Sequence, residues 1–207
     1  SHEDEEEESH DEEEHFLHSA EETEEEHNEH VHTMDEHVWT SPCNAIDIVE
    51  HITEELCSLD PEHGQTYKDN AEAYETQLKE LDTAFRDVVE NAKNHTLLFG
   101  DRFPFRYFAA EYGLDYYAAF SGCASDTEPS AATMAFLINK VKEEHIPVVL
   151  KMELSNDNIA NAIAEACDVP VRVFYSSHNI SAKQFEAGVT YLDLMKENVE
   201  TLKEALR

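Results

Sequence analysis

The spacing of apolar residues in the first half of the chain predicts two helices. Ser41-Pro42 combines a favoured N-cap residue with one preset for the first helical turn, and Asp60-Pro61 repeats this signal. Helical steps separate the apolar residues that follow the first signal: Ile48, Ile52, Leu56 and Leu59. Alternating steps of four and three separate those that follow the second: Tyr67, Ala71, Tyr74, Leu78, Leu81, Phe85 and Val88. We therefore predict a short helix over 42–59 and a long one of about 30 residues, roughly 45 Å, over 61–94. The long helix is either a bundle helix or a strut between two lobes.

After residue 94 the pattern changes to short apolar runs that alternate with amphipathic stretches. The runs lie at 95–101, 114–122, 146–153 and 169–176, and we predict four strands there. Helices are predicted for "RYFAAEYG", closed by Gly113, and over 130–145, 155–167 and 181–207. Alternating strands and helices are typical of βαβ units. The predicted fold class is α/β, with a four-stranded parallel sheet flanked by helices.

Charge is concentrated at the start of the chain. The 207 residues include 47 Asp and Glu against 14 Lys and Arg, a formal net charge of −33, and residues 1–37 contain 18 of those carboxylates and 8 of the 13 histidines. Such a polyanion repels nucleic acid and anionic membranes and attracts cations. Residues 1–36 contain too few apolar residues to form a core, so we expect them to be disordered without metal. A solvated charge run would not need imidazoles, so we interpret this segment as a loose metal collector, with candidate sites at His27, His30 and His32.

The cysteines and the start of the chain give little information about the cellular compartment. Cys43, Cys57, Cys123 and Cys167 have no C-x-x-C spacing, and one disulfide is possible without an assigned pairing. No apolar run in these residues is long enough to span a bilayer, and we expect no signal peptide within them. Because the chain starts inside a low-complexity run without Met, we expect it to be a fragment.

Polar residues follow each of the predicted strands. Ligands bind beyond the carboxyl ends of strands in open parallel sheets. The polar residues at these ends are Asp101, Glu128, Glu153 and His178. Carboxylate and imidazole groups suit zinc or manganese, so this edge is a candidate metal site.

Each of these residues also has a structural interpretation. For Asp101, the N-cap of the next helix is as good an interpretation as a metal ligand. For Glu153, we favour a role at the start of the helix near Ser155. Glu128, before a proline, fits a solvated turn, and His178 fits a loop histidine bonded to backbone. The spacing alone leaves these alternatives open.

The block "DEHVWTSP" (35–42) resembles the D-x-H-x-W-x-[SN]-P-like segment of the zinc/manganese solute-binding proteins of bacterial ABC transporters. The acidic, His-rich loop before it resembles the loop of the zinc-specific members. The stretch "FGDRFPFRYFAAEYGLDYYAAFSGCASDTEPS" (99–130) is similar to a zinc-binding subgroup. The order of these motifs extends the resemblance over essentially the whole chain.

The resemblance implies a domain organisation and a ligand set. Residues 1–36 would be the acidic loop, 37–60 the end of an N-terminal lobe, 61–94 the interlobe helix and 95–207 the C-terminal α/β lobe, with most of the first lobe missing. The family's ligand histidine falls on His37, and its last ligand, often acidic, falls near His178. The third is normally His or Glu, and Asp101 is the nearest candidate here. The family's first ligand histidine has no counterpart in this chain.

The function that the resemblance implies is extracytoplasmic zinc capture and delivery to an ABC permease, by a periplasmic or lipid-anchored protein. We expect Zn²⁺ rather than Mn²⁺ because of the imidazoles, and we expect a monomer that does not bind nucleic acid. The alternatives are a zinc-buffering metallochaperone and a surface adhesin. An enzyme is not expected, because a metallohydrolase would need an open coordination position and a placed base, and no H-E-x-x-H set occurs.

Overall fold

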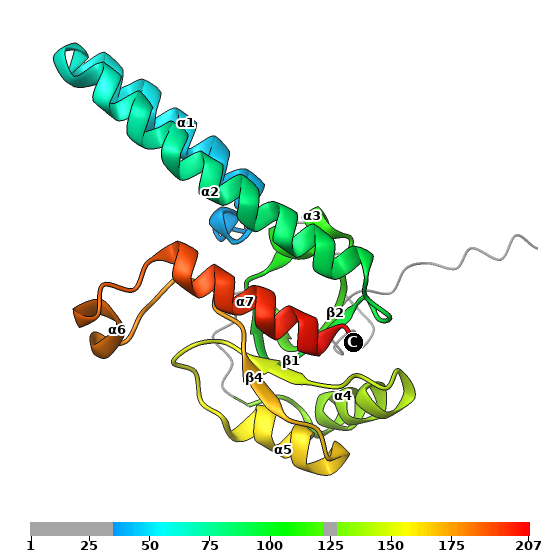
Figure 1. Ribbon diagram of the computed structural model, residues 1–207. Coiled ribbons are helices and arrows are strands. Elements are labelled where there is room, and N and C mark those ends of the chain that lie inside the picture. The colour runs from blue at the N-terminus through cyan, green and yellow to red at the C-terminus, as the bar shows by residue number, and fades with distance from the viewer. Residues whose placement is uncertain (1–34, 122–127) are drawn as a thin grey trace, which may run out of the picture.

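A computed structural model describes residues 35–121 and 128–207 (Figure 1). The first part contains two 3-10 turns and two helices: η1 (Val38–Thr40), α1 (Pro42–Leu59), η2 (Pro61–His63) and α2 (Gly64–Glu90). The second part is built from strands that alternate with helices: β1 (Thr96–Phe103), α3 (Arg106–Tyr112), β2 (Asp115–Ser121), α4 (Ala131–Glu143), β3 (Val149–Lys151), α5 (Asn158–Cys167), β4 (Val171–Val173), α6 (Ala182–Glu186) and α7 (Tyr191–Ala205).

The four strands form one parallel sheet in the order β2-β1-β3-β4. Phe99 of β1 lies between Ala118 of β2 and Leu150 of β3 in this register. All four predicted strands are present, although β3 and β4 are shorter than their apolar runs. The predicted α/β class is therefore confirmed.

Helices cover both faces of the sheet (Figure 1). On one face, Leu98 of β1 packs with Leu137 of α4 and Ile163 of α5. On the other face, Leu97 and Phe99 pack in a core that includes α2 and α7. Because successive side chains of a strand point to opposite faces, β1 contributes to both cores. The result is a three-layer arrangement with β1 at its centre.

Helices α1 and α2 form an antiparallel hairpin that extends beyond the sheet (Figure 1). Ser41 caps α1, because its side chain accepts a hydrogen bond from the Asn44 N–H, and α2 follows the predicted second start. The predicted apolar stripe of α2 is buried at Leu78, Leu81 and Phe85. The stripe of α1 is exposed at three positions: Ile52, Leu56 and Leu59. The division into lobes stays a prediction.

Two predictions about local structure had different outcomes. Gly113 closes α3 in the left-handed conformation (φ 63°), which confirms the predicted helix end. The predicted continuous helix over 181–207 is wrong. Gly188 adopts φ 70°, and Thr190 then starts α7 with a reciprocal capping box to Asp193. The left-handed glycine ends the first helix, and the capping box after it starts a second one. Within the described residues, no helix has the length and apolar character needed to cross a bilayer.

Candidate metal centre

His37 lies in a short segment that crosses the carboxyl edge of the sheet, which we call the strap (residues 35–40). The side chain is buried, with the residue 3% exposed. Asp35 Oδ1 accepts a hydrogen bond from the His37 backbone N–H (2.9 Å) and lies 2.8 Å from His37 Nδ1. The Thr40 hydroxyl donates to the His37 carbonyl oxygen (2.8 Å). Both the ring and the backbone of His37 are therefore held by neighbours in the strap.

Three long-range hydrogen bonds attach the strap to the α/β part of the chain. The Tyr107 hydroxyl of α3 donates to the Asp35 carbonyl oxygen (3.0 Å). The Trp39 indole N–H donates to the Ser176 carbonyl oxygen beyond β4 (2.9 Å). The Tyr191 hydroxyl, at the start of α7, donates to the Trp39 carbonyl oxygen (2.8 Å). Burial raises the pKa of Tyr191, so this hydroxyl keeps its proton and stays a donor.

His178 is brought to the same place by the loop after β4. Its ring centroid lies 5.6 Å from that of His37, and the Trp39 ring lies 5.5 Å from His37 and 5.9 Å from His178. Ser177 just before it has φ 58°, an uncommon conformation for a residue with a side chain. The Ser177 hydroxyl oxygen is buried without a hydrogen-bond partner among the described residues. A strained residue and an unsatisfied hydroxyl thus accompany the exposed His178 ring.

Glu153, two residues after the end of β3, supports this loop. Its carboxylate accepts hydrogen bonds from the Ser176 backbone N–H (2.8 Å) and hydroxyl (2.6 Å), and the Ser176 hydroxyl oxygen accepts from the His178 N–H (3.3 Å). The interpretation that Glu153 prepares the following helix is wrong, because α5 begins only at Asn158, after Asp157. Glu153 instead connects the ends of β3 and β4.

Asp101 lies inside β1 and is 5% exposed. Its carboxylate accepts the backbone N–H of Arg102 (2.8 Å) and, from the end of β3, that of Met152 (3.0 Å). The N-cap interpretation is wrong, since α3 begins after Phe105 and has no side-chain cap. Asp101 also does not belong to either of the compact donor groups found in the described residues. His178 also lies outside both groups, so the structure brings the rings of His37 and His178 together, and a shared site with Asp101 stays a prediction.

The other predicted site residues lie elsewhere. Glu128 is exposed, two residues before the N-cap of α4. The collector candidates, His27, His30 and His32, lie outside the described residues.

One of the two compact donor groups in the described part of the chain surrounds His37. Ligand atoms of Asp35, Glu36 and His37 lie within 4.8 Å of one another. With His178 nearby, the edge offers imidazole nitrogen and carboxylate oxygen, the donor types that bind zinc in proteins.

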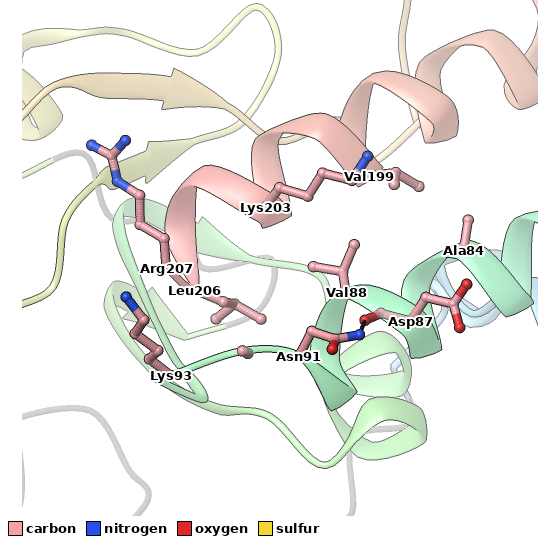
Figure 2. A pocket seen from close by; sticks show the side chains of 10 residues that line it. Ala84, Asp87, Val88, Asn91, Lys93, Val199, Lys203, Leu206 and Arg207 are labelled. Carbon is pink, nitrogen blue, oxygen red and sulfur yellow. Dashed lines mark hydrogen bonds between the residues drawn. The ribbon is translucent and has the colours of Figure 1, made fainter.

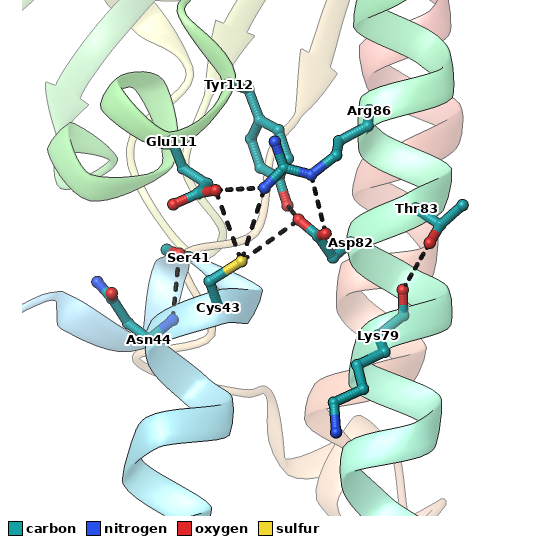
Figure 3. A network of polar contacts seen from close by, with 9 residues as sticks. All are labelled: Ser41, Cys43, Asn44, Lys79, Asp82, Thr83, Arg86, Glu111 and Tyr112. Atoms are coloured by element: carbon teal, nitrogen blue, oxygen red, sulfur yellow. Dashed lines mark hydrogen bonds and ion pairs between the residues drawn. The ribbon is translucent and has the colours of Figure 1, made fainter.

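The second donor group, Cys43, Asp82 and Glu111, already contacts a cation (Figure 3). The Arg86 guanidinium pairs with Asp82 (2.9 Å) and with Glu111, and it also contacts the Cys43 sulfur (3.7 Å). Burial, followed by the charges of Asp82 and Glu111, raises the pKa of the Cys43 thiol to about 11. This cluster joins α1, α2 and α3 as an ion-paired contact rather than an open metal site.

A pocket of about 480 Å³ lies between the C-terminal ends of α2 and α7 (Figure 2). Val88, Val199 and Leu206 contribute its apolar lining. Lys93, which also lines the pocket, stands three residues before the start of β1 at Thr96. The pocket therefore lies at the edge of the sheet where the strands begin. It is separate from the His37 edge.

Sequence reasoning missed the residues that hold the two histidines. Asp35 had a detectable signal, since it stands two residues before His37 in the same block. Trp39 stands in that block too, but nothing in the sequence indicates its partners, nor those of Tyr107 and Tyr191, because these bonds join segments as many as 152 positions apart.

Comparisons with known proteins agree on one family. The family model described as "Zinc-uptake complex component A periplasmic" matches residues 2–205. The high-affinity zinc uptake system protein ZnuA of Bacillus subtilis is 32% identical over 175 residues, which are 84% of this chain and 54% of the relative. This chain therefore spans about half the length of that relative.

Solved structures support the same assignment. The zinc-bound ZnuA-like domain of Streptococcus pneumoniae AdcA is 33% identical, with a TM-score of 0.71 over 84% of this chain and 64% of that one. A mutant of the laminin-binding adhesin Lmb of Streptococcus agalactiae is 25% identical, with a TM-score of 0.73 over 84% and 63%.

Proposed function

The chain belongs to the family of the periplasmic component A of zinc-uptake complexes, and on this premise we propose that it captures Zn²⁺ outside the cytoplasm for delivery to an ABC permease. The zinc-uptake relative from Bacillus subtilis and the zinc-bound domain from Streptococcus pneumoniae support this proposal. Zinc is the cargo of such a protein, so binding must be tight and reversible rather than catalytic.

The single observation that supports capture at a defined site is the approach of the His37 and His178 rings, 5.6 Å apart between centroids. The two residues are 141 positions apart in the sequence. Two imidazoles that converge from separate loops form a typical half of a tetrahedral zinc site. We propose His37 and His178 as ligands, while Asp101 remains a predicted third ligand whose carboxylate also holds two backbone N–H groups.

The donor types support zinc over manganese. Imidazole nitrogen suits zinc, whereas manganese prefers sites dominated by carboxylate, carbonyl and water oxygen. The acidic segment over 1–36 would act as a loose collector that raises the local Zn²⁺ concentration, with His27, His30 and His32 among its donors.

The assembly and location follow from the same premise. We propose that the protein acts as an extracytoplasmic monomer, periplasmic or lipid-anchored, with 37–60 as the end of one lobe, 61–94 as the interlobe helix and 95–207 as the second lobe. Its partner would be the permease of the uptake system.

Zinc titration of the chain tests the proposal, with a chromophoric chelator as competitor. The wild-type chain should contain one tight site and several weak ones. The double variant His37→Ala, His178→Ala should lose the tight site and keep the weak ones. The matched control His51→Ala, His145→Ala removes two exposed histidines and should keep the tight site. Tight binding that survives in the first double variant would reject the ligand pair.

The alternatives make different demands on the molecule. A zinc buffer needs only the loose sites, so the double variant would bind zinc like the wild-type chain. An adhesin would need no imidazole pair, and the laminin-binding neighbour is less similar in sequence than the zinc relatives are. The paired histidines therefore favour capture.

A further inference from the structure

We propose that Asp35 and Trp39 are positioning residues that assemble His37 and His178 into a preformed half-site attached to the parallel sheet. This inference rests on the proposed function, since it assigns roles around the same ligand pair. Neither residue needs to touch the metal.

Asp35 determines which nitrogen of His37 carries a proton. Its Oδ1 lies 2.8 Å from His37 Nδ1, and an ionised carboxylate can only accept a hydrogen bond. In a neutral ring, donation from Nδ1 to this carboxylate leaves the lone pair on Nε2. A carboxylate behind a ligand histidine orients the ring and increases the basicity of the nitrogen that binds metal. The second bond, from the His37 backbone N–H to the same oxygen, fixes the carboxylate itself (2.9 Å).

Trp39 determines where the strap lies. Its indole N–H binds the Ser176 carbonyl oxygen, two residues before His178, and its own carbonyl oxygen accepts from Tyr191. One residue thus contacts the loop after β4 and the first turn of α7. Its ring lies beside both imidazoles, at 5.5 and 5.9 Å between centroids. Loss of the indole N–H would release the strap from the His178 loop.

The His178 side of the half-site is held in a similar way. Ser176 is 1% exposed, and Glu153 accepts from both its backbone N–H and its hydroxyl. The Trp39 bond therefore ends on a residue that Glu153, just after β3, already holds. These hydrogen bonds therefore join the strap to the His178 loop across the proposed boundary between the lobes, so the two histidines are held together although His37 stands before α1 and the hairpin.

The tautomer gives the first test. Long-range ¹H–¹⁵N spectra of the metal-free chain, with His37 assigned by a His37→Gln variant, should show His37 protonated at Nδ1. In Asp35→Ala this preference should disappear. A wild-type His37 protonated at Nε2 would overturn the role of Asp35, and this readout does not depend on zinc affinity.

Metal binding gives the second test. Asp35→Ala should raise the zinc dissociation constant about 10- to 100-fold, the usual effect of removing such a partner. Asp35→Asn, which keeps an acceptor oxygen, should restore part of this loss, and the exposed control Asp115→Asn should bind like the wild type. The visible spectrum of bound Co²⁺ should keep its intensity in Asp35→Ala. A spectrum that indicates a lost ligand would make Asp35 a ligand and overturn the positioning role.

The strap gives the third test. Trp39→Phe and Tyr191→Phe should each speed amide hydrogen exchange across residues 36–41 in the metal-free chain and weaken zinc binding about 3- to 10-fold, as expected for one lost hydrogen bond. Tyr67→Phe, which loses a comparable bond to Asp60 (2.8 Å) at the far end of the hairpin, is the control. Unprotected exchange of the wild-type strap would overturn the preformed half-site. If the wild-type chain lacks a tight zinc site, the proposed function fails, whereas the tautomer and exchange results still decide this inference.

Discussion

Asp101→Asn should destabilise the fold whether or not the residue binds metal. The carboxylate is 5% exposed and accepts one N–H on each oxygen, from Arg102 and from Met152. An amide has a single acceptor oxygen, so one of these N–H groups would face an NH₂ donor. Losing a hydrogen bond to a charged group costs about 1.5–3 kcal/mol, and a buried unpaired N–H costs about 1–3 kcal/mol. Both values include the cost of the same unpaired N–H group, so they are not added together. We therefore expect the free energy of unfolding to fall by about 2–3 kcal/mol.

The assay is urea denaturation of the metal-free chain, followed by far-UV circular dichroism with a chelator present. Asp115→Asn makes the same chemical change at an exposed position at the start of β2, and it should change the free energy of unfolding by less than about 0.5 kcal/mol. A loss below about 0.5 kcal/mol in Asp101→Asn would refute the argument that this carboxylate links β1 to β3.

Adding zinc to the same assay separates the link between strands from a ligand role. A ligand that binds only the native state stabilises it by an amount set by its concentration and dissociation constant. If Asp101 is only a link between strands, saturating zinc should stabilise Asp101→Asn as much as the wild type. If it is also the third ligand, the stabilisation by zinc should be smaller in the variant.

Two further predictions concern the scaffold. Burial raises the pKa of the Cys43 thiol from 9.0 to about 11, so its alkylation by iodoacetamide at pH 8.5 should be about 100-fold slower in the native than in the unfolded chain, as measured by peptide mass spectrometry. Because the native pKa is raised, the contribution of this thiol to stability is full below pH 9 and is lost as the pH rises towards 11. Equal rates would contradict the buried contact. Gly100→Ala should lower stability by about 1–3 kcal/mol in thermal unfolding, because its Cβ would lie 2.5 Å from the Ala160 Cα, whereas Gly64→Ala, with nothing nearer than 3.6 Å, should be neutral or stabilising.

The regular elements were predictable because their signals are local. The stripe of α2, the strand runs and the left-handed Gly113 each depend on a few neighbouring residues. The break at Gly188 was also detectable, since Thr190 and Asp193 form a capping box of the expected spacing. The prediction of one helix over 181–207 gave more weight to amphipathic periodicity than to this local signal.

The candidate site was predictable only in part. The strand-end rule placed His178 at the edge of the sheet and the family resemblance added His37, and their rings do meet there. The roles of Asp101 and Glu153 were missed because each carboxylate accepts backbone N–H groups from another strand or loop. Backbone donors occur at every non-proline residue, so no residue type in the sequence identifies them.

The least predictable feature is the backbone at the ends of β3 and β4. Leu154 and Ser177 adopt φ values of 57° and 58°, in a region where glycine or asparagine is normally expected. Each follows a residue of the Glu153–Ser176 contact, so the hydrogen bonds across the two strand ends compensate for the local strain. A prediction from sequence patterns assumes unstrained turns, so it does not predict such a loop. The left-handed conformation of Ser177 turns the chain directly before His178. This irregular backbone therefore places the His178 imidazole beside that of His37.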